Sequence, residues 1–90
     1  MLVSFSDPFK KAYRKKIGKG SRMEITFKEA LGIFIGNPFD ERLKTHKLSG
    51  KLKDLWSFSV TYNIRVVFYF THEKPEKAIF VNIGNHDEVY

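Results

Sequence analysis

The sequence predicts an α+β fold in which a hairpin of two helices packs on a four-stranded, twisted, mainly antiparallel sheet. Three observations support this prediction. Apolar residues recur at helical spacing before Pro38, they follow strand spacing later in the chain, and proline and glycine separate the segments. The predicted order of elements is β-α-α-β-β-β. Because no linker or internal repeat interrupts it, we expect residues 1–90 to form a single domain.

The first helix is predicted by its start signal and its apolar spacing. A short β-compatible segment, Leu2–Phe5, precedes it. Ser6 can cap a helix N-terminus, and Pro8 suits the first helical turn. The apolar stripe that follows has a spacing of four residues and consists of Phe9, Tyr13 and Ile17. Gly18-Lys19-Gly20 then ends the helix.

A second helix is predicted from near Ser21 to the stop signal Gly36-Asn37-Pro38. Its apolar residues fall on one side and are Met23, Phe27, Ala30, Leu31 and Phe34. The two helices should therefore form a hairpin in which each buries one face.

Strand patterns follow Pro38. Large apolar residues alternate with Ser and Thr over Trp56–Thr61, which predicts a strand with one buried face. After a tight turn at Tyr62-Asn63, Ile64–Phe70 is apolar on both faces except for Arg65, so this strand should be central. The last strand is predicted from Lys77 to Ile83 and should end at Gly84.

Composition excludes several kinds of site. The chain has no cysteine, so it has neither a disulfide framework nor a thiolate metal site. Its three histidines, His46, His72 and His86, are too far apart for a metal-binding motif, and no glycine-rich phosphate loop is present. No apolar run is long enough to span a bilayer, and the N-terminus lacks the features of a signal peptide. We therefore expect no metal, no membrane association and a cytoplasmic location.

Charge gives the first indication of a partner. The net charge is +6, and the basic residues are clustered. Lys10–Lys28 contains eight Lys or Arg and one acid, and Arg42–Lys53 contains five and no acid. Such clusters favour binding to a polyanion such as nucleic acid. The alternative is an ordinary basic domain with a solvated surface.

Three polar features do not fit a purely structural account: the basic segment Lys44–Lys53, Arg65, and the ending Gly84–Tyr90. In the first, we expect Leu48 and Leu52 to anchor the segment to the core while the lysines point outward. Each feature also has a structural explanation. His46 can be an ordinary exposed histidine, Arg65 can form an ion pair with Asp54, Asp87 or Glu88, and Tyr90 can pack its ring under a helix.

The arrangement of these features resembles the RelE/YafQ-type toxins of bacterial toxin–antitoxin pairs. The segment His46-Lys47-Leu48-Ser49-Gly50-Lys51-Leu52 is similar to the H-x-L-x-G-x-[LW] step of that family. Ile64-Arg65-Val66-Val67-Phe68-Tyr69 is similar to its central R-[IV]-[IV]-[FY] strand, and Ile83–Tyr90 is similar to its closing G-[TS]-H-x-x-[LV]-[FY]. The three pieces occur in the family's order, and they imply a RelE-like fold.

The resemblance implies roles for particular residues. His46, His86 and Tyr90 match catalytic positions, and Arg65 matches a strand arginine that binds phosphate. The lysines expected to hold flanking phosphates of the RNA are Lys44, Lys47, Lys51 and Lys53. The chain departs from YafQ-like members at two positions expected to contact RNA, where Ser59 replaces a histidine and Asn63 replaces an aspartate.

The resemblance also implies an activity and partners. The expected activity is that of a metal-independent endoribonuclease, an mRNA interferase, which turns the RNA 2′-hydroxyl on the adjacent phosphate without a cofactor. The expected partners are mRNA held in the 70S ribosome and a small acidic antitoxin, through which the complex binds operator DNA. The alternatives are a ParE-like inhibitor of DNA gyrase, whose family lacks the His46, His86 and Tyr90 set, and a catalytically inactive RNA-binding module.

Overall fold

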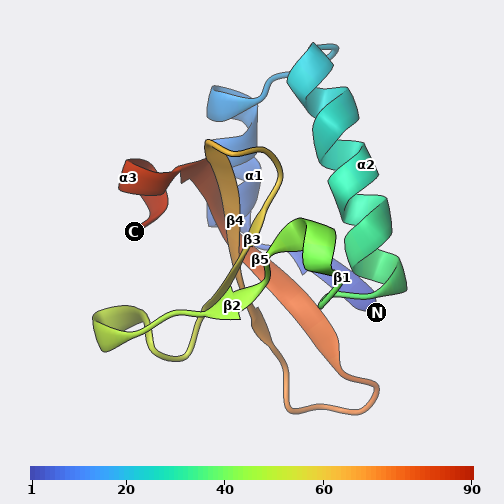
Figure 1. Ribbon diagram of the computed structural model, residues 1–90, viewed down its shortest axis with the longest axis vertical. Helices are drawn as coiled ribbons and strands as arrows, with labels where there is room; N and C mark the ends of the chain where they lie inside the picture. Colours follow the sequence, from blue (N-terminus) through green and yellow to red (C-terminus); the bar gives the residue numbers. More distant parts are fainter.

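The computed structural model describes residues 1–90 and confirms the predicted α+β class. Helices α1 and α2 pack on one face of a five-stranded sheet, and a short helix α3 ends the chain (Figure 1). The α-helices and strands in chain order are β1 (Leu2–Phe5), α1 (Asp7–Lys16), α2 (Arg22–Gly36), β2 (His46–Lys47), β3 (Trp56–Ser59), β4 (Ile64–Phe70), β5 (Lys77–Asn85) and α3 (His86–Val89). Two 3-10 helices, η1 (Glu41–Leu43) and η2 (Gly50–Leu52), flank β2. None of the helices is long and apolar enough to cross a membrane.

Both predicted helix starts are confirmed. Ser6 precedes α1, and its hydroxyl oxygen accepts a hydrogen bond from the Phe9 backbone N–H at 3.2 Å. Ser21 precedes α2 and accepts in the same way from the Glu24 N–H at 3.1 Å. These caps satisfy backbone donors that have no partner within the helix.

Glu24 joins the two helices of the hairpin. Its carboxylate accepts a hydrogen bond from the Gly20 N–H at 3.0 Å and another from the Tyr13 hydroxyl at 3.2 Å. The bond from Gly20, followed by that from Tyr13, lowers the pKa of Glu24. Burial, together with the hydrogen bond to Glu24, raises the pKa of Tyr13 to about 12. The hairpin is therefore fixed by a charge-assisted contact as well as by apolar packing.

The strand order in the sheet is β1-β5-β4-β3-β2. The prediction that Ile64–Phe70 is central is confirmed, since β4 lies third. The sheet is mainly antiparallel, and only β1 runs parallel to its neighbour β5. A fifth strand was not predicted: β2 has two residues, which pair with Ser57 and Trp56 of β3.

The predicted end of the last strand at Gly84 is wrong. Strand β5 continues to Asn85, because Gly84 pairs with Arg65 and Asn85 pairs with Ile64 on β4. This extension carries the end of β5 past Arg65, and α3 begins at the next residue.

The core between the helices and the sheet is built from phenylalanine. Phe34 of α2 lies with its ring centroid 4.9 Å from Phe58, 5.0 Å from Phe68 and 5.2 Å from Phe80. All four side chains are fully buried, and such packed rings supply most of the apolar burial available to a short chain. The expected anchoring of the basic segment to this core is wrong, because Leu48 and Leu52 are half-buried and lie outside it.

Candidate active site

The sheet face opposite α1 and α2, which we call the outer face, is covered in part by α3 (Figure 1). Side chains alternate along a strand, so the residues between the core positions of β3 and β4 point to this face. Ser57 and Val67 are such a cross-strand pair, and both are buried. Val89 of α3 is buried as well, and neither valine belongs to the main core. Ser57, Val67 and Val89 are therefore buried on the outer face, where α3 packs.

Helix α3 is held by a capping box at its N-terminus and by a salt bridge to α1. The Asn85 side chain accepts from the Glu88 N–H at 3.0 Å, and the Glu88 carboxylate accepts from the Asn85 N–H at 2.8 Å, which forms a capping box. Glu88 also contacts Lys16 of α1, with Oε1 to Nζ at 2.6 Å. The contact with Lys16, more than the backbone hydrogen bond, lowers the pKa of Glu88.

Gly84 allows α3 to lie this close to β5. A Cβ atom at position 84 would lie 3.1 Å from Cβ and 3.1 Å from Oε1 of Glu88, and 3.4 Å from Cγ1 of Val89. The first two distances are tighter than ordinary van der Waals contact. The absence of a side chain at Gly84 therefore sets how closely His86 and Tyr90 approach the sheet.

Tyr90 lies between the two histidines that the sequence singled out. Its ring centroid is 4.4 Å from that of His86, edge to face, and 6.5 Å from that of His46. Its hydroxyl donates a hydrogen bond to Oγ of Ser57. Because Ser57 is paired with His46 across β2 and β3, this bond places the phenol beside His46. His46 and Ser57 from the middle of the chain thus meet Tyr90 from its end on the outer face.

The ring of His46 has one nitrogen engaged and one free. Its Nδ1 lies 3.0 Å from the carbonyl oxygen of Lys44. Since a carbonyl only accepts, this contact is a hydrogen bond when Nδ1 carries the proton, which leaves Nε2 of the neutral ring as an acceptor. His86 is exposed and has Nδ1 at 3.6 Å from a carboxylate oxygen of Asp87, a solvent-exposed contact that contributes little to stability.

Arg65 is held on the outer face by neutral hydrogen-bond partners and makes no ion pair with an Asp or Glu. Its Nη1 donates to Oγ of Ser59, its Nη2 donates to the Tyr62 carbonyl oxygen at 2.9 Å, and its buried Nε–H has no partner within the chain. The ion pair considered as its structural explanation is absent, because no carboxylate lies within 4.0 Å of the guanidinium. A half-buried guanidinium held by neutral partners keeps its full charge for an anionic ligand.

Arg65 and His86 line the same hollow of about 540 Å³. The other residues around it are Lys16, Tyr62, Asn63, Ile64, Asn85 and Asp87. The hollow therefore joins a fixed guanidinium, an imidazole and a lysine beside Tyr90. It provides positive charge and a titratable group at one location, as the expected reaction at a phosphate requires.

No protein-family model and no curated protein matches the chain, but solved structures do. YafQ from E. coli superimposes with a TM-score of 0.77 at 18% identity, over 98% of this chain and 96% of that one. The YoeB/ParE toxin from Agrobacterium tumefaciens gives 0.75 at 17% identity, over 96% and 99%. A metal-bound toxin from Helicobacter pylori gives 0.74 at 20% identity, over 100% and 99%.

The chain has the fold of the RelE/ParE toxin superfamily. The superposition covers nearly all of both chains, so the whole fold is shared. The RelE-like fold expected from the sequence is thereby confirmed.

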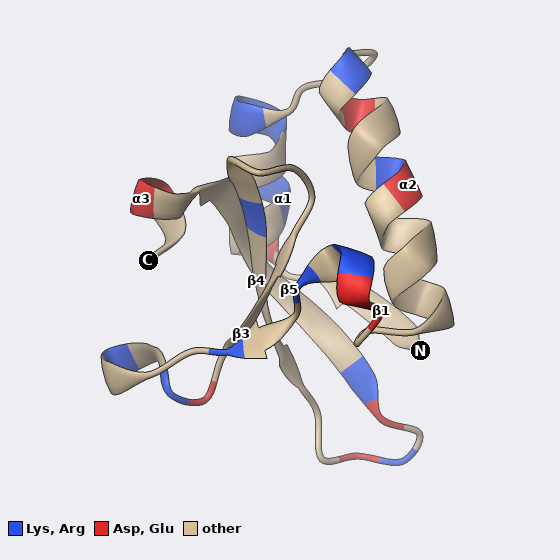
Figure 2. Cartoon of the chain, in the orientation of Figure 1, with Lys and Arg blue, Asp and Glu red and all other residues tan.

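On this RelE/ParE-type fold, the predicted site residues fall into two groups. The residues that the structure brings together on the outer face are His46, Arg65, His86 and Tyr90. Two of the positions expected to contact RNA lie there as well. Ser59 accepts a hydrogen bond from Arg65, and Asn63 lines the hollow beside Arg65. The four lysines are exposed and more scattered. Lys47 pairs with Trp56 and so points away from the face that carries His46. Lys51 and Lys53 belong to the projecting loop between β2 and β3 (Figures 1 and 2).

Two residues of this site were not predicted from the sequence. Ser57 has the only buried polar side chain, and Lys16 reaches α3 from the last turn of α1. A serine between two aromatic residues in a strand is a weak signal of such a role. No group of three or more His, Cys, Asp or Glu residues is placed to hold a metal ion.

Proposed function

We propose that the chain is the toxin of a type II toxin–antitoxin system and an endoribonuclease that cuts mRNA. One observation supports the reaction above all others. His46, Arg65 and the pair His86 and Tyr90 come from three separate segments of the sequence and lie near one another on an open face of the sheet. The toxin names of the structures that share the fold support the biological role.

In the proposed reaction, the 2′-oxygen of the RNA attacks the adjacent phosphorus atom. A general base removes the 2′-hydroxyl proton, and a general acid protonates the departing 5′-oxygen, which leaves a 2′,3′-cyclic phosphate and a free 5′-hydroxyl. The engaged Nδ1 and free Nε2 of His46 suit it as the base. His86, whose ring lies on the other side of Tyr90 and beside Asp87, suits the role of acid. Base and acid on opposite sides fit the in-line displacement.

Arg65 and Tyr90 would act on the phosphate and the nucleotide between the two imidazoles. The planar guanidinium of Arg65 can donate to the non-bridging oxygens as negative charge develops there. The Tyr90 phenol, held by Ser57, can orient the 2′-hydroxyl or stack on a base. No step of this reaction uses a metal or a cofactor.

The ribosome is proposed as the place of cleavage. The hollow beside Arg65 is about 540 Å³, which accommodates a nucleotide but not a long RNA strand. Lysine and arginine follow α1 and its connection to α2 (Figure 2). These charges would bind ribosomal RNA while the decoding site holds the mRNA in an extended form.

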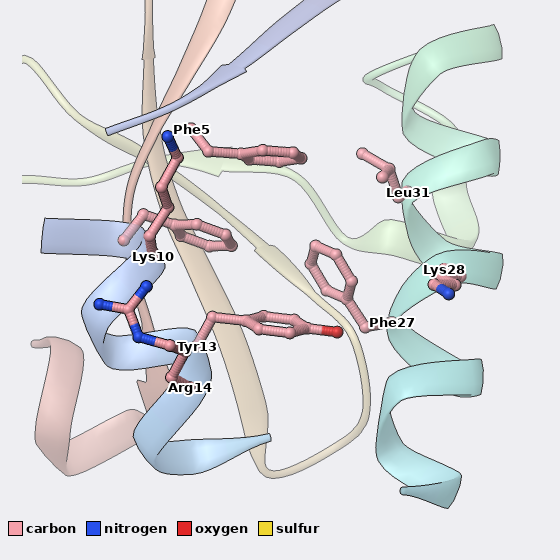
Figure 3. A pocket seen from close by; sticks show the side chains of 8 residues that line it. Phe5, Lys10, Tyr13, Arg14, Phe27, Lys28 and Leu31 are labelled. Carbon is pink, nitrogen blue, oxygen red and sulfur yellow. The ribbon is translucent and has the colours of Figure 1, made fainter. Parts of the chain in front are cut away.

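An acidic antitoxin is proposed to dock on the helix hairpin. A groove of about 340 Å³ between α1, α2 and β1 is lined by Phe5, Phe9, Tyr13, Phe27 and Leu31, with Lys10, Arg14 and Lys28 around it (Figure 3). An amphipathic segment with apolar anchors and flanking Asp or Glu would match both features. The solved DinJ–YafQ toxin–antitoxin complex from E. coli supports the proposal that a chain of this fold has an antitoxin partner.

The reaction is tested with purified protein, mRNA and ribosomes. We expect products with 5′-hydroxyl and cyclic phosphate ends, formed faster with programmed ribosomes than with free RNA. Replacing His86 or Arg65 with alanine should lower cleavage by about 10²-fold or more. Full cleavage by both variants would contradict the assignment of the site. Growth arrest with DNA breaks and intact mRNA would instead support the gyrase alternative.

A further inference from the structure

Lys16 is the only residue lining the hollow beside Arg65 that belongs to the helix hairpin. It is the last residue of α1, and its side chain is 31% exposed. Its Nζ lies 2.6 Å from Oε1 of Glu88, so the ammonium is held at the wall of the hollow instead of extending into water. The proposed reaction uses Arg65 at the cleaved phosphate and assigns no role to this second cation.

The charges around the hollow favour an anion next to Lys16. Lys16 and Arg65 line the hollow together, and Asp87 is the only carboxylate among its lining residues. The Asp87 side chain is fully exposed, so water and salt screen its charge. Glu88 accepts a hydrogen bond from one of the three N–H groups of the ammonium, which leaves two donors for a ligand. Such an exposed ion pair is weak, and a phosphate can compete with it.

The direction of the RNA strand in the proposed reaction determines which phosphate meets Lys16. His86, proposed as the acid beside the departing 5′-oxygen, lines the hollow, whereas His46, proposed as the base beside the attacking 2′-oxygen, does not. The nucleotide that follows the cleaved bond must therefore leave Arg65 on the side of His86, toward the hollow. The 3′-phosphate of that nucleotide is the next negative charge along the strand, and Lys16 is the cation beyond Arg65 in this direction.

We propose that Lys16 binds the phosphate on the 3′ side of the nucleotide that follows the cleaved bond. Its ammonium donates to a non-bridging oxygen of that phosphate while Glu88 continues to hold the side chain in place. Lys16 thus increases the affinity for RNA and takes no part in the proton transfers. This site deepens the proposed function and depends on it for the direction of the strand. The alternative is that Lys16 only fastens α3 through Glu88.

Binding is measured without cleavage and without ribosomes, by fluorescence anisotropy of a short labelled single strand in which every sugar is a 2′-deoxyribose. Lys16→Gln should raise Kd about tenfold, as expected for one lost charge-assisted hydrogen bond, and should reduce the dependence of log Kd on log salt concentration by about 0.7. Lys15→Gln is the matched control, because it removes the same charge from the preceding residue of α1, which does not line the hollow. It should change Kd far less.

Glu88→Gln separates phosphate binding from a purely structural role of Lys16. Glutamine can still accept the hydrogen bond from the Asn85 N–H in the capping box, but it removes the charge that holds Lys16. The ammonium should then bind the single strand as tightly as in the native protein, or more tightly. A loss equal to that of Lys16→Gln would show that Lys16 only fastens α3 and would overturn the proposal. Equal Kd values for Lys15→Gln and Lys16→Gln would overturn it as well.

A neutral phosphate identifies the group that Lys16 contacts. In a short RNA whose cleavage site has been mapped, a methylphosphonate replaces the phosphate one nucleotide downstream of the cleaved bond. It should raise KM about tenfold for the native protein and cause no further increase in Lys16→Gln. Equal increases in both proteins would overturn this site even though the RNA is cut. The expected order of Kd values in a protein that cuts no RNA would uphold phosphate binding by Lys16 and overturn the proposed reaction.

Discussion

Replacing Ser57 with alanine should loosen Tyr90 without unfolding the protein. The substitution removes the acceptor of the Tyr90 hydroxyl and leaves no new buried polar group, because the Ser57 hydroxyl itself disappears. Tyr90 is 39% exposed, so its hydroxyl can bind water instead. The loss is then that of one neutral hydrogen bond, about 1 kcal/mol of unfolding free energy. For a chain of this size, that corresponds to a fall of roughly 4–8 °C in Tm.

The consequence for cleavage should exceed the consequence for stability. If Ser57 holds the phenol at the reacting nucleotide, Ser57→Ala and Tyr90→Phe should each lower kcat by about tenfold, and the double variant should be no worse than either. Ser49→Ala is the control, since Ser49 is exposed and its side chain makes no capping hydrogen bond to η2, the 3-10 helix that follows it. Thermal unfolding and single-turnover cleavage measure the two effects. Additive losses in the double variant, or normal cleavage by Ser57→Ala, would show that Ser57 does not act through Tyr90.

Three further perturbations test the surroundings of the site. Gly84→Ala should displace α3 by a few tenths of an ångström and lower cleavage by about tenfold with little change in Tm, and NMR shifts confined to α3 and β5 would verify the cause. Arg65→Lys keeps the charge but loses the planar donor fork, so kcat/KM should fall on the order of tenfold to a hundredfold; an unchanged value would show that charge alone suffices. The pKa of Glu88 in the folded protein lies below the ordinary pKa of a glutamate. The contact of Glu88 with Lys16 therefore stabilises α3 fully at pH values above the ordinary pKa, and this stabilisation is lost as the pH falls through the lowered pKa. Unfolding measured between pH 6 and pH 3 should show less pH dependence in Glu88→Gln, and identical curves would contradict the role of its contact with Lys16.

The sequence predicted those parts of the fold that local signals determine. Ser6 and Ser21 start α1 and α2 because a cap and an apolar stripe act within a few residues. The central position of β4 followed from apolar residues on both of its faces. Strand β2 was missed because two residues show no periodicity, and its pairing depends on β3.

The arrangement of the candidate site was less predictable because long-range contacts create it. Motif resemblance selected His46, Arg65, His86 and Tyr90, and the structure places them near one another. The burial of Ser57 could not be read from its strand, where it alternates with core residues like any exposed serine. It is buried only because α3 returns over the sheet from the end of the chain.

In the proposed reaction, His46 and His86 act on opposite sides of one phosphate, as base and acid. A short RNA in which sulfur replaces the bridging 5′-oxygen of the cleaved bond separates the two roles. A thiolate leaves without a proton, so this substrate should restore cleavage by His86→Ala almost to the native rate and give no relief to His46→Ala. Equal restoration of both variants, or of neither, would show that the two histidines do not divide the roles of base and acid in this way.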